Sequence, residues 1–177
     1  MTVRCAAYLG MSLDGFIAGP NDELDWLEGV EAIAGEDFGF GAFMTSVDAL
    51  VMGRRTFEAV LGFDIPWPYA KPILVMSSSL QQIPERATDS ELFAGDPAAA
   101  IAEAADRGWT KLYIDGGRLV SSFINEGLLD ELVVSVLPVA LGTGIPVFGA
   151  LEKLTWFSHV STTTFDNGMV QTTYTLA

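Results

Sequence analysis

Apolar residues in this chain gather in short runs that alternate with amphipathic stretches. A run of about four to eight apolar residues between turn-forming residues is typical of a buried β-strand. The strands expected in the first two thirds of the chain are residues 3–10, 49–52, 73–76, 91–94 and 112–114. The helices expected between them lie within residues 37–46 and at residues 56–61, 97–107 and 117–126. Strands that alternate with helices predict parallel pairing, with helices on both faces of the sheet.

The pattern changes after residue 130. Residues 131–141, 155–165 and 169–176 have the composition of strands, and no helical stretch separates them. Asp166, Asn167 and Gly168 form a strong hairpin-turn signal, because Asn and Gly tolerate the backbone angles that a tight turn requires. We therefore predict a mixed, mostly parallel sheet with an antiparallel C-terminal hairpin.

Length and composition indicate one domain. The chain has 177 residues, half of them hydrophobic, and no Pro/Ser/Gly-rich linker divides it, so we expect a single domain over residues 1–177. The apolar runs are too short to cross a bilayer, and the first residues lack the apolar segment of a secretory signal. We expect a cytoplasmic protein. Cys5 is the only cysteine, which excludes an internal disulfide and gives no metal-ligand spacing, so no metal is expected.

The charge is strongly negative. A net charge of −14 repels nucleic acid and anionic membranes, so neither is an expected partner. Only nine Lys and Arg residues are present, and an anionic ligand must be met by a local concentration of them. Arg54 and Arg55 are the only adjacent basic pair, and they follow a predicted strand that ends at Gly53.

Three expected strand ends suit an anion. Their sequences are Gly53-Arg54-Arg55-Thr56, Ser77-Ser78-Ser79 and Asp115-Gly116-Gly117-Arg118. The unpaired N–H groups at a helix N-terminus bind phosphate, and ligands of open α/β sheets lie outside the carboxyl ends of the strands. Together the three ends predict a phosphorylated dinucleotide. Taken singly, each has a simpler explanation, such as solvated arginines or a serine turn.

The order of these motifs resembles the dihydrofolate reductase-like superfamily. More narrowly, the chain is similar to the reductase domain of the bifunctional riboflavin-biosynthesis deaminase-reductase, over nearly its whole length. The motifs that carry the resemblance are Ser12-Leu13-Asp14-Gly15-Phe16-Ile17-Ala18, Val51-Met52-Gly53-Arg54-Arg55-Thr56-Phe57, Met76-Ser77-Ser78, Gly116-Gly117-Arg118-Leu119 and Leu141-Gly142-Thr143-Gly144-Ile145-Pro146. The resemblance implies a three-layer α/β fold and NADPH-dependent hydride transfer to a small heterocycle of pyrimidine or pterin type.

The resemblance also implies roles for individual residues. Arg54, with Ser77 and Ser78, would hold the 2′-phosphate of NADPH, while Arg55 and Thr56 would face its pyrophosphate. The segment from Gly116 to Leu119 would form a second wall, and Gly10, Ile17 and Ala18 would line the nicotinamide. The cofactor-binding residues implied are thus Gly10, Ile17, Ala18, Gly53, Arg54, Arg55, Thr56, Ser77, Ser78, Gly116, Gly117, Arg118 and Leu119.

Two acids are candidates for the catalytic residue. Asp37 lies sixteen residues before Gly53, similar to the spacing of the substrate-binding acid in dihydrofolate reductases, and Asp14 lies in the loop beside the nicotinamide region. Each has a structural alternative, because Asp37 suits a helix N-terminus and Asp14 suits an Asp-Gly turn.

The sequence defines the substrate-binding residues less clearly than the cofactor-binding ones. Trp26, Phe40 and Trp67 are candidates for stacking on a planar substrate, although aromatic residues in an apolar chain also pack the core. Tyr8 stands where the riboflavin reductases carry a lysine, which removes a partner for a phosphoribosyl group.

Two functions from different classes remain beside this one. A non-catalytic NADPH-binding or sensor protein would bind the cofactor tightly without substrate-stimulated oxidation, and a structural module would lose no nucleotide affinity in Arg54→Ala. We also expect a homodimer, paired through the apolar C-terminal strands and residues 141–148.

Overall fold

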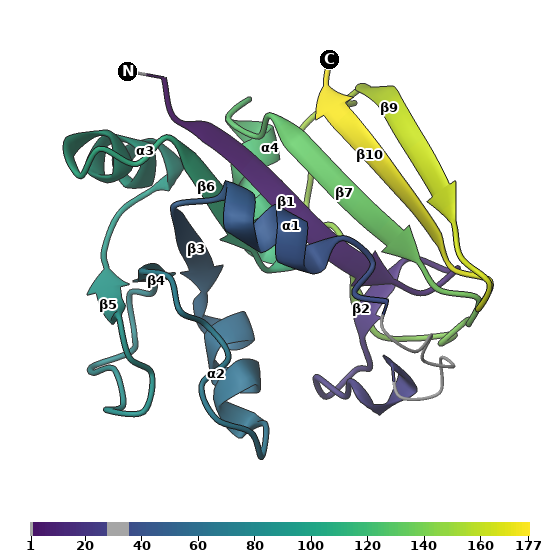
Figure 1. Ribbon diagram of the computed structural model, residues 1–177, viewed down its shortest axis with the longest axis horizontal. Coiled ribbons are helices and arrows are strands. Elements are labelled where there is room, and N and C mark those ends of the chain that lie inside the picture. Colours follow the sequence, from purple (N-terminus) through teal and green to yellow (C-terminus); the bar gives the residue numbers. More distant parts are fainter. Residues whose placement is uncertain (1, 28–35) are drawn as a thin grey trace.

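An eight-stranded sheet forms the centre of the computed structural model, which describes residues 2–27 and 36–177 (Figure 1). The strand order is β5-β4-β3-β6-β1-β7-β10-β9. The strands are β1 (Arg4–Met11), β3 (Ala49–Gly53), β4 (Ile73–Met76), β5 (Ser90–Phe93), β6 (Lys111–Asp115), β7 (Glu131–Val136), β9 (Phe157–Thr164) and β10 (Val170–Leu176). Neighbours from β5 to β7 pair in parallel, whereas β10 pairs antiparallel with β7 and β9. The predicted mixed sheet is confirmed.

Helices cover both faces of the sheet. The helices are α1 (Phe40–Ser46), α2 (Arg54–Gly62), α3 (Pro97–Asp106) and α4 (Gly117–Asn125), with a short 3-10 helix η1 at Asp25–Leu27. Ala100 of α3 and Phe123 of α4 belong to the core on one face, and Phe43 of α1 and Phe57 of α2 belong to the core on the other. The central strands are therefore buried on both sides, which explains their continuous apolar runs.

The alternation of side chains along β1 links the two cores. Cys5 and Ala7 point into the core under α3 and α4, whereas Ala6 points into the core under α1. Successive strand residues face opposite sides of a sheet, so a strand of small residues can serve both layers. The result is the three-layer arrangement that the sequence predicts.

Two element boundaries differ from the sequence-based expectation by more than two residues. The predicted strand 131–141 is wrong beyond Val136, because the chain leaves the sheet before Pro138, which cannot donate a ladder hydrogen bond. The helix expected within residues 37–46 begins only at Phe40, after Gly39 in left-handed backbone (φ 84°).

The chain that leaves β7 builds a second, smaller sheet. β8 (Ile145–Pro146) pairs antiparallel with β2 (Phe16–Ala18), a pairing that no periodicity in the sequence indicated. Backbone hydrogen bonds from Leu13 N to Val139 O (2.7 Å) and from Val147 N to Gly15 O (2.8 Å) extend the contact. Two loops more than a hundred residues apart in the sequence are thereby joined beside the ends of β1 and β6.

The C-terminal hairpin ends the sheet. Its turn closes with a hydrogen bond from Phe165 N to Met169 O (2.9 Å), and Gly168 takes the left-handed conformation (φ 82°) that a tight hairpin turn requires. β9 lies at the edge of the sheet with most of its side chains exposed. Within the described residues, no helix is both long enough and apolar enough to cross a bilayer.

Candidate functional site

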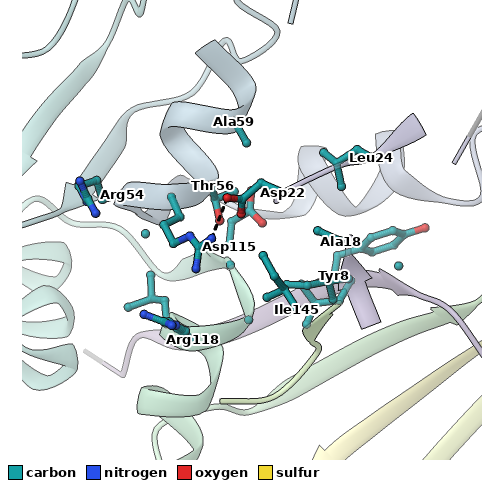
Figure 2. Close-up of a pocket in the computed structure, with 18 of the residues that line it drawn as sticks. Tyr8, Ala18, Asp22, Leu24, Arg54, Thr56, Ala59, Asp115, Arg118 and Ile145 are labelled. Atoms are coloured by element: carbon teal, nitrogen blue, oxygen red, sulfur yellow. Dashed lines mark hydrogen bonds and ion pairs between the residues drawn. The ribbon is translucent and has the colours of Figure 1, made fainter. Parts of the chain in front are cut away.

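A cavity of about 540 Å³ lies at the carboxyl ends of β3, β6 and β1 (Figure 2). Its volume falls within the range of known small-molecule and cofactor sites. Most residues implied for cofactor binding line this one cavity, namely Gly10, Ile17, Ala18, Gly53, Arg54, Arg55, Thr56, Gly116, Gly117, Arg118 and Leu119.

The pairing of β3 with β6 explains why distant motifs meet. Met52 lies opposite Asp115 in the parallel register, so the next residues, Gly53 and Gly116, leave the sheet side by side. A Cβ atom on Gly116 would lie 3.9 Å from Gly53 N and 2.5 Å from Thr56 Oγ1. Gly116 also has φ 111°, which L side chains rarely adopt. Only glycine fits this position.

Gly117 is constrained from the opposite side of the cavity. A Cβ atom there would lie 2.5 Å from Val147 O and 3.0 Å from Ile17 Cδ1. The first turn of α4 therefore touches both β2 and the chain that follows β8. This close approach brings the small sheet against the helix N-terminus.

Two helix N-termini at the cavity have free N–H groups. Gly53 precedes α2 and Gly116 precedes α4, and neither helix has a side-chain cap or an acidic residue in its first turn. The first N–H groups of a helix have no partner within the helix and carry its positive dipole end. Such a pair of N-termini is suited to bind phosphate groups.

Three arginines add positive charge. Arg54 Nη1 lies 3.5 Å from Glu58 Oε1, one turn along α2, and Arg55 Nη2 lies 2.7 Å from Asp22 Oδ2. Arg118 forms no ion pair with the residues that the structure describes. Ion pairs of exposed side chains are weak, so a ligand phosphate can compete for these guanidinium groups.

Asp115 is a buried acid in the cavity wall. The residue is 8 % exposed. Burial raises the pKa of its carboxyl to about 6, against the opposing effect of the Tyr113 and Tyr69 hydroxyls and the Gly116 N–H. A carboxyl that remains protonated in mildly acidic solution can donate a proton. Asp115 belongs to the Asp115–Arg118 motif, and the sequence alone assigns it no role.

Tyr8 forms another part of the wall. Its hydroxyl donates to Phe38 O (2.7 Å) and accepts from Gln171 Nε2 (2.7 Å), and burial raises its pKa. Gln171 also donates to Ser135 Oγ (3.0 Å). These contacts connect β1, β7, β10 and the segment before α1, so the Tyr8 ring is held in place.

The two acids proposed from the sequence do not line the cavity. Asp37 accepts hydrogen bonds from Gly39 N (2.9 Å) and Gly41 N (3.0 Å) at the start of α1, and these bonds lower its pKa. Asp14 accepts from Ser12 Oγ (2.6 Å) and from two backbone N–H groups, at Leu141 and Gly142. The pKa of Asp14 is lowered to about 2, mainly by the Ser12 hydroxyl.

The other predicted residues outside the cavity wall have different contacts. Ser77 Oγ accepts from Ser79 N (3.2 Å) and Leu80 N (2.9 Å), so these serines form the simple turn that was the alternative to phosphate binding. Ser78 is exposed.

The three aromatic candidates for substrate stacking do not line the cavity either. Phe40 packs edge-on against Tyr8 (5.3 Å between ring centroids), and Trp67 packs against Phe57 (5.5 Å). Trp26 lies in η1, between Leu24 and Leu27, which do line the cavity.

Several lining residues are not among those expected from the sequence. They are Tyr8, Asp22, Leu24, Leu27, Ala59, Met76, Asp115, Ser122 and Ile145, together with Leu9. Asp115 had a signal, because it directly precedes two glycines at a strand end. Ile145 stands in the Leu141–Pro146 motif, which gave it no role, and it reaches the cavity through the β2–β8 pairing. Leu24, in the loop after β2, had no signal.

The strand order and the cavity at the carboxyl ends of the parallel strands belong to an α/β protein with the dihydrofolate reductase-like fold. Residues 5–171 match the model of the RibD C-terminal domain. The chain belongs to the RibD C-terminal domain family.

Individual relatives agree with this assignment. The protein YwjB of Bacillus subtilis (strain 168) is 34 % identical over 159 residues, which are 88 % of each chain. A putative riboflavin biosynthesis protein from Shewanella sp. PV-4 has a structure that superposes with a TM-score of 0.93 at 39 % identity, covering 99 % of both chains. Dihydrofolate reductase from Enterococcus faecalis, complexed with NADP(H) and RAB-propyl, shares the fold at 18 % identity with a TM-score of 0.64, covering 98 % of this chain and 96 % of that one.

Proposed function

We propose that this protein is an NADPH-dependent reductase that transfers a hydride to a small heterocyclic substrate. The observation that carries the proposal is the convergence of two uncapped helix N-termini and three arginines on one cavity at the carboxyl ends of parallel strands. Positive charge is scarce in a chain of net charge −14, so its concentration here favours an anionic ligand.

The cavity wall fits a dinucleotide with phosphate groups. Arg54 would hold the 2′-phosphate, and Arg55 with Thr56 would face the pyrophosphate, because guanidinium groups bind phosphate in a bidentate, charge-assisted way. Gly116 and Gly117 let Thr56 and the chain after β8 pack closely against the N-terminus of α4, which borders the cavity. Ser77 and Ser78 do not line the cavity, so the proposal relies on Arg54 for the 2′-phosphate. The fold shared with a reductase complexed with NADP(H) supports this choice of cofactor.

The bound cofactor supplies the hydride, and the chain supplies position and exclusion of water. Gly10, Ile17 and Ala18 would line the nicotinamide at the end of β1 and along β2. Leu24 and Ile145 extend this apolar wall. Apolar side chains on this side keep water from the reacting atoms, while the charged groups lie at the α2 and α4 N-termini.

The proton that accompanies the hydride needs a donor within the cavity. Asp115 meets this requirement better than Asp14 and Asp37, whose carboxylates accept backbone hydrogen bonds elsewhere and have lowered pKa values. We assign the proton-donating role to Asp115, directly or through one water molecule.

The substrate is proposed to be a pyrimidine-like or pterin-like heterocycle. The family and the putative riboflavin biosynthesis relative support a substrate of this class. Tyr8 lines the cavity where the riboflavin reductases carry a lysine, and its hydroxyl is held by Phe38 O and Gln171. We therefore expect a substrate with less negative charge than a phosphoribosyl compound.

We also propose a homodimer that pairs through the β9 edge. Trp156 is 71 % exposed and Val160 is 56 % exposed at this edge. An exposed strand edge with apolar side chains is a site for pairing with another chain.

The test of function combines binding and turnover. Calorimetry would measure the affinities of wild type and Arg54→Ala for NADPH and NADH, and absorbance would follow NADPH oxidation with dihydrofolate, the ribosylaminopyrimidine of flavin synthesis, quinones and ketones. We expect wild type to prefer NADPH and Arg54→Ala to lose most of that preference. Tight NADPH binding without oxidation by any substrate would favour the sensor alternative, and preference for NADH would refute the phosphate assignment.

A further inference from the structure

The shortest ion pair in the cavity wall joins two residues from different elements. Arg55 Nη2, in the first turn of α2, lies 2.7 Å from Asp22 Oδ2, in the loop between β2 and η1 (Figure 2). Both residues line the cavity. The guanidinium group that the proposed function assigns to a ligand phosphate therefore already has an anion, supplied by the protein itself.

The loop that carries Asp22 is a compact turn. Gly19 N donates to Glu23 O (2.8 Å), and Asp22 N donates to Gly19 O (3.2 Å). The Glu23 carboxylate also accepts from Asn21 N and Asn21 Nδ2, both at 2.7 Å. The turn is thus formed by its own hydrogen bonds and does not depend on the ion pair for its shape.

The backbone of Asp22 is left-handed, with φ 66°. A residue other than glycine adopts this conformation at a cost, and Asp and Asn tolerate it better than most. The local turn therefore holds the Asp22 carboxylate out toward α2, where it reaches Arg55.

The ion pair is exchangeable. The side chains of Arg55 and Asp22 are 42 % and 46 % exposed, and pairs this accessible to water contribute little to stability. A phosphate group at the N-terminus of α2 would gain the free N–H groups of the helix in addition to the guanidinium. Asp22 pairs with the Arg55 side chain and does not cap α2, so a phosphate that uses both the guanidinium and the N–H groups is the stronger partner.

We propose that Asp22 is a specificity-determining competitor for the anionic ligand, whose carboxylate occupies Arg55 until a diphosphate group displaces it. The proposal rests on the proposed function of the cavity. Its consequence is that weakly charged ligands do not displace Asp22, so Arg55 is available only to a ligand that carries phosphate. Binding of the diphosphate also releases the turn at residues 19–23 from α2.

The experiment is calorimetric titration at low ionic strength with three ligands: NADPH, ADP and adenosine. Asp22→Asn removes the charge and keeps a side chain that tolerates positive φ. We expect Asp22→Asn to tighten NADPH and ADP binding by a factor of about two to five, the range that loss of an exposed ion pair corresponds to. Adenosine, which has no phosphate, should bind wild type and variant equally.

Two controls isolate the contact. Asp25→Asn removes the same formal charge three residues away, from η1, and should give a clearly smaller change. In an Arg55→Ala background, Asp22→Asn should have no effect on ADP affinity, because the guanidinium group for which Asp22 and the phosphate compete is absent. Asp22→Gly, which suits the left-handed backbone, serves as a second variant if Asp22→Asn folds poorly, as judged by circular dichroism.

The outcomes separate this proposal from the proposed function. Equal gains in Asp22→Asn and Asp25→Asn, a gain that persists without Arg55, or unchanged or weaker ADP binding in Asp22→Asn would each overturn the role of Asp22. Wild type that binds ADP but neither NADPH nor NADH would refute the proposed function and still allow the Asp22 test. Wild type that binds none of these nucleotides would overturn both.

Discussion

At the scale of single residues, Asp115 determines the expected pH dependence. A carboxyl with a pKa of about 6 is protonated below that pH, so a reductase that uses it as the proton donor loses kcat as pH rises through about 6. Asp115→Asn should lower kcat by about a hundredfold or more and abolish this limb of the pH profile. Steady-state kinetics between pH 5 and about 8 test the prediction.

Asp64→Asn is the matched control for this variant, because Asp64 is exposed and lies outside the cavity wall. It should keep the wild-type profile. A limb near pH 6 that survives in Asp115→Asn would assign the titration to another group.

The same burial has a consequence for stability. The folded-state pKa of Asp115 lies above the ordinary value of 3.8, so the folded state binds the proton more tightly than the unfolded state. Asp115 therefore destabilises the fold increasingly as pH rises from about 4 to about 6, and by a constant amount above that. The difference in Tm between Asp115→Asn and wild type should therefore be more positive at pH 8 than at pH 4, as measured by thermal melts. A constant Tm difference would contradict the buried, titrating carboxyl.

At the scale of elements, the strand-to-helix turn at Gly116 combines steric and backbone constraints. Gly116→Ala would place Cβ against Thr56 Oγ1 at φ 111°, and we expect it to cost about 1–3 kcal/mol of stability and to weaken NADPH binding more than tenfold. Gly127→Ala is the control, since Gly127 also has positive φ (69°) but no atom within 4 Å of its Cβ position. Thermal melts and calorimetry should show destabilisation in both variants and a loss of affinity only in Gly116→Ala.

The Asp14 contact joins the loop after β1 to the chain after β7. Because hydrogen bonds hold the folded-state pKa of Asp14 at about 2, below the ordinary value of 3.8, its contribution to stability is present above about pH 4 and is lost as pH falls toward 2. Asp14→Ala should increase hydrogen exchange at Leu141 N and Gly142 N, the two amides that donate to it. Unchanged protection of these amides would show that the β2–β8 pairing alone holds the loops together.

At the scale of the whole molecule, the exposed edge of the sheet predicts association. Val160→Glu should shift the proposed homodimer to monomer in light scattering, because a charge would be buried between two edges. Thr162→Glu, farther along the same strand, should also give monomer if a charge anywhere along the β9 edge prevents pairing. A wild-type protein that is monomeric at all concentrations would refute the proposed dimer.

Periodicity and turn chemistry predict those parts of this fold that depend on neighbouring residues. Ile73 to Met76 was identified as a strand at its exact bounds, and the Asn167-Gly168 turn was recognised from two residues, since both signals are local. The glycine and arginine motifs after β3 and β6 are also identifiable from the sequence. A strand, a glycine and the start of a helix follow one another there within a few residues.

The tertiary structure alone decided which polar groups face the cavity. Asp14 and Asp115 are both acids beside glycine in the sequence, yet the β2–β8 pairing gives Asp14 backbone N–H partners outside the cavity, and the position of β6 between β1 and β3 buries Asp115 in its wall. Asp22 meets Arg55 only because the loop after β2 folds against α2, 33 residues further along the chain. Local pattern determines the backbone conformation, whereas burial and charge pairing depend on residues that are distant in the sequence, and these set the proton affinity and the partners of each side chain.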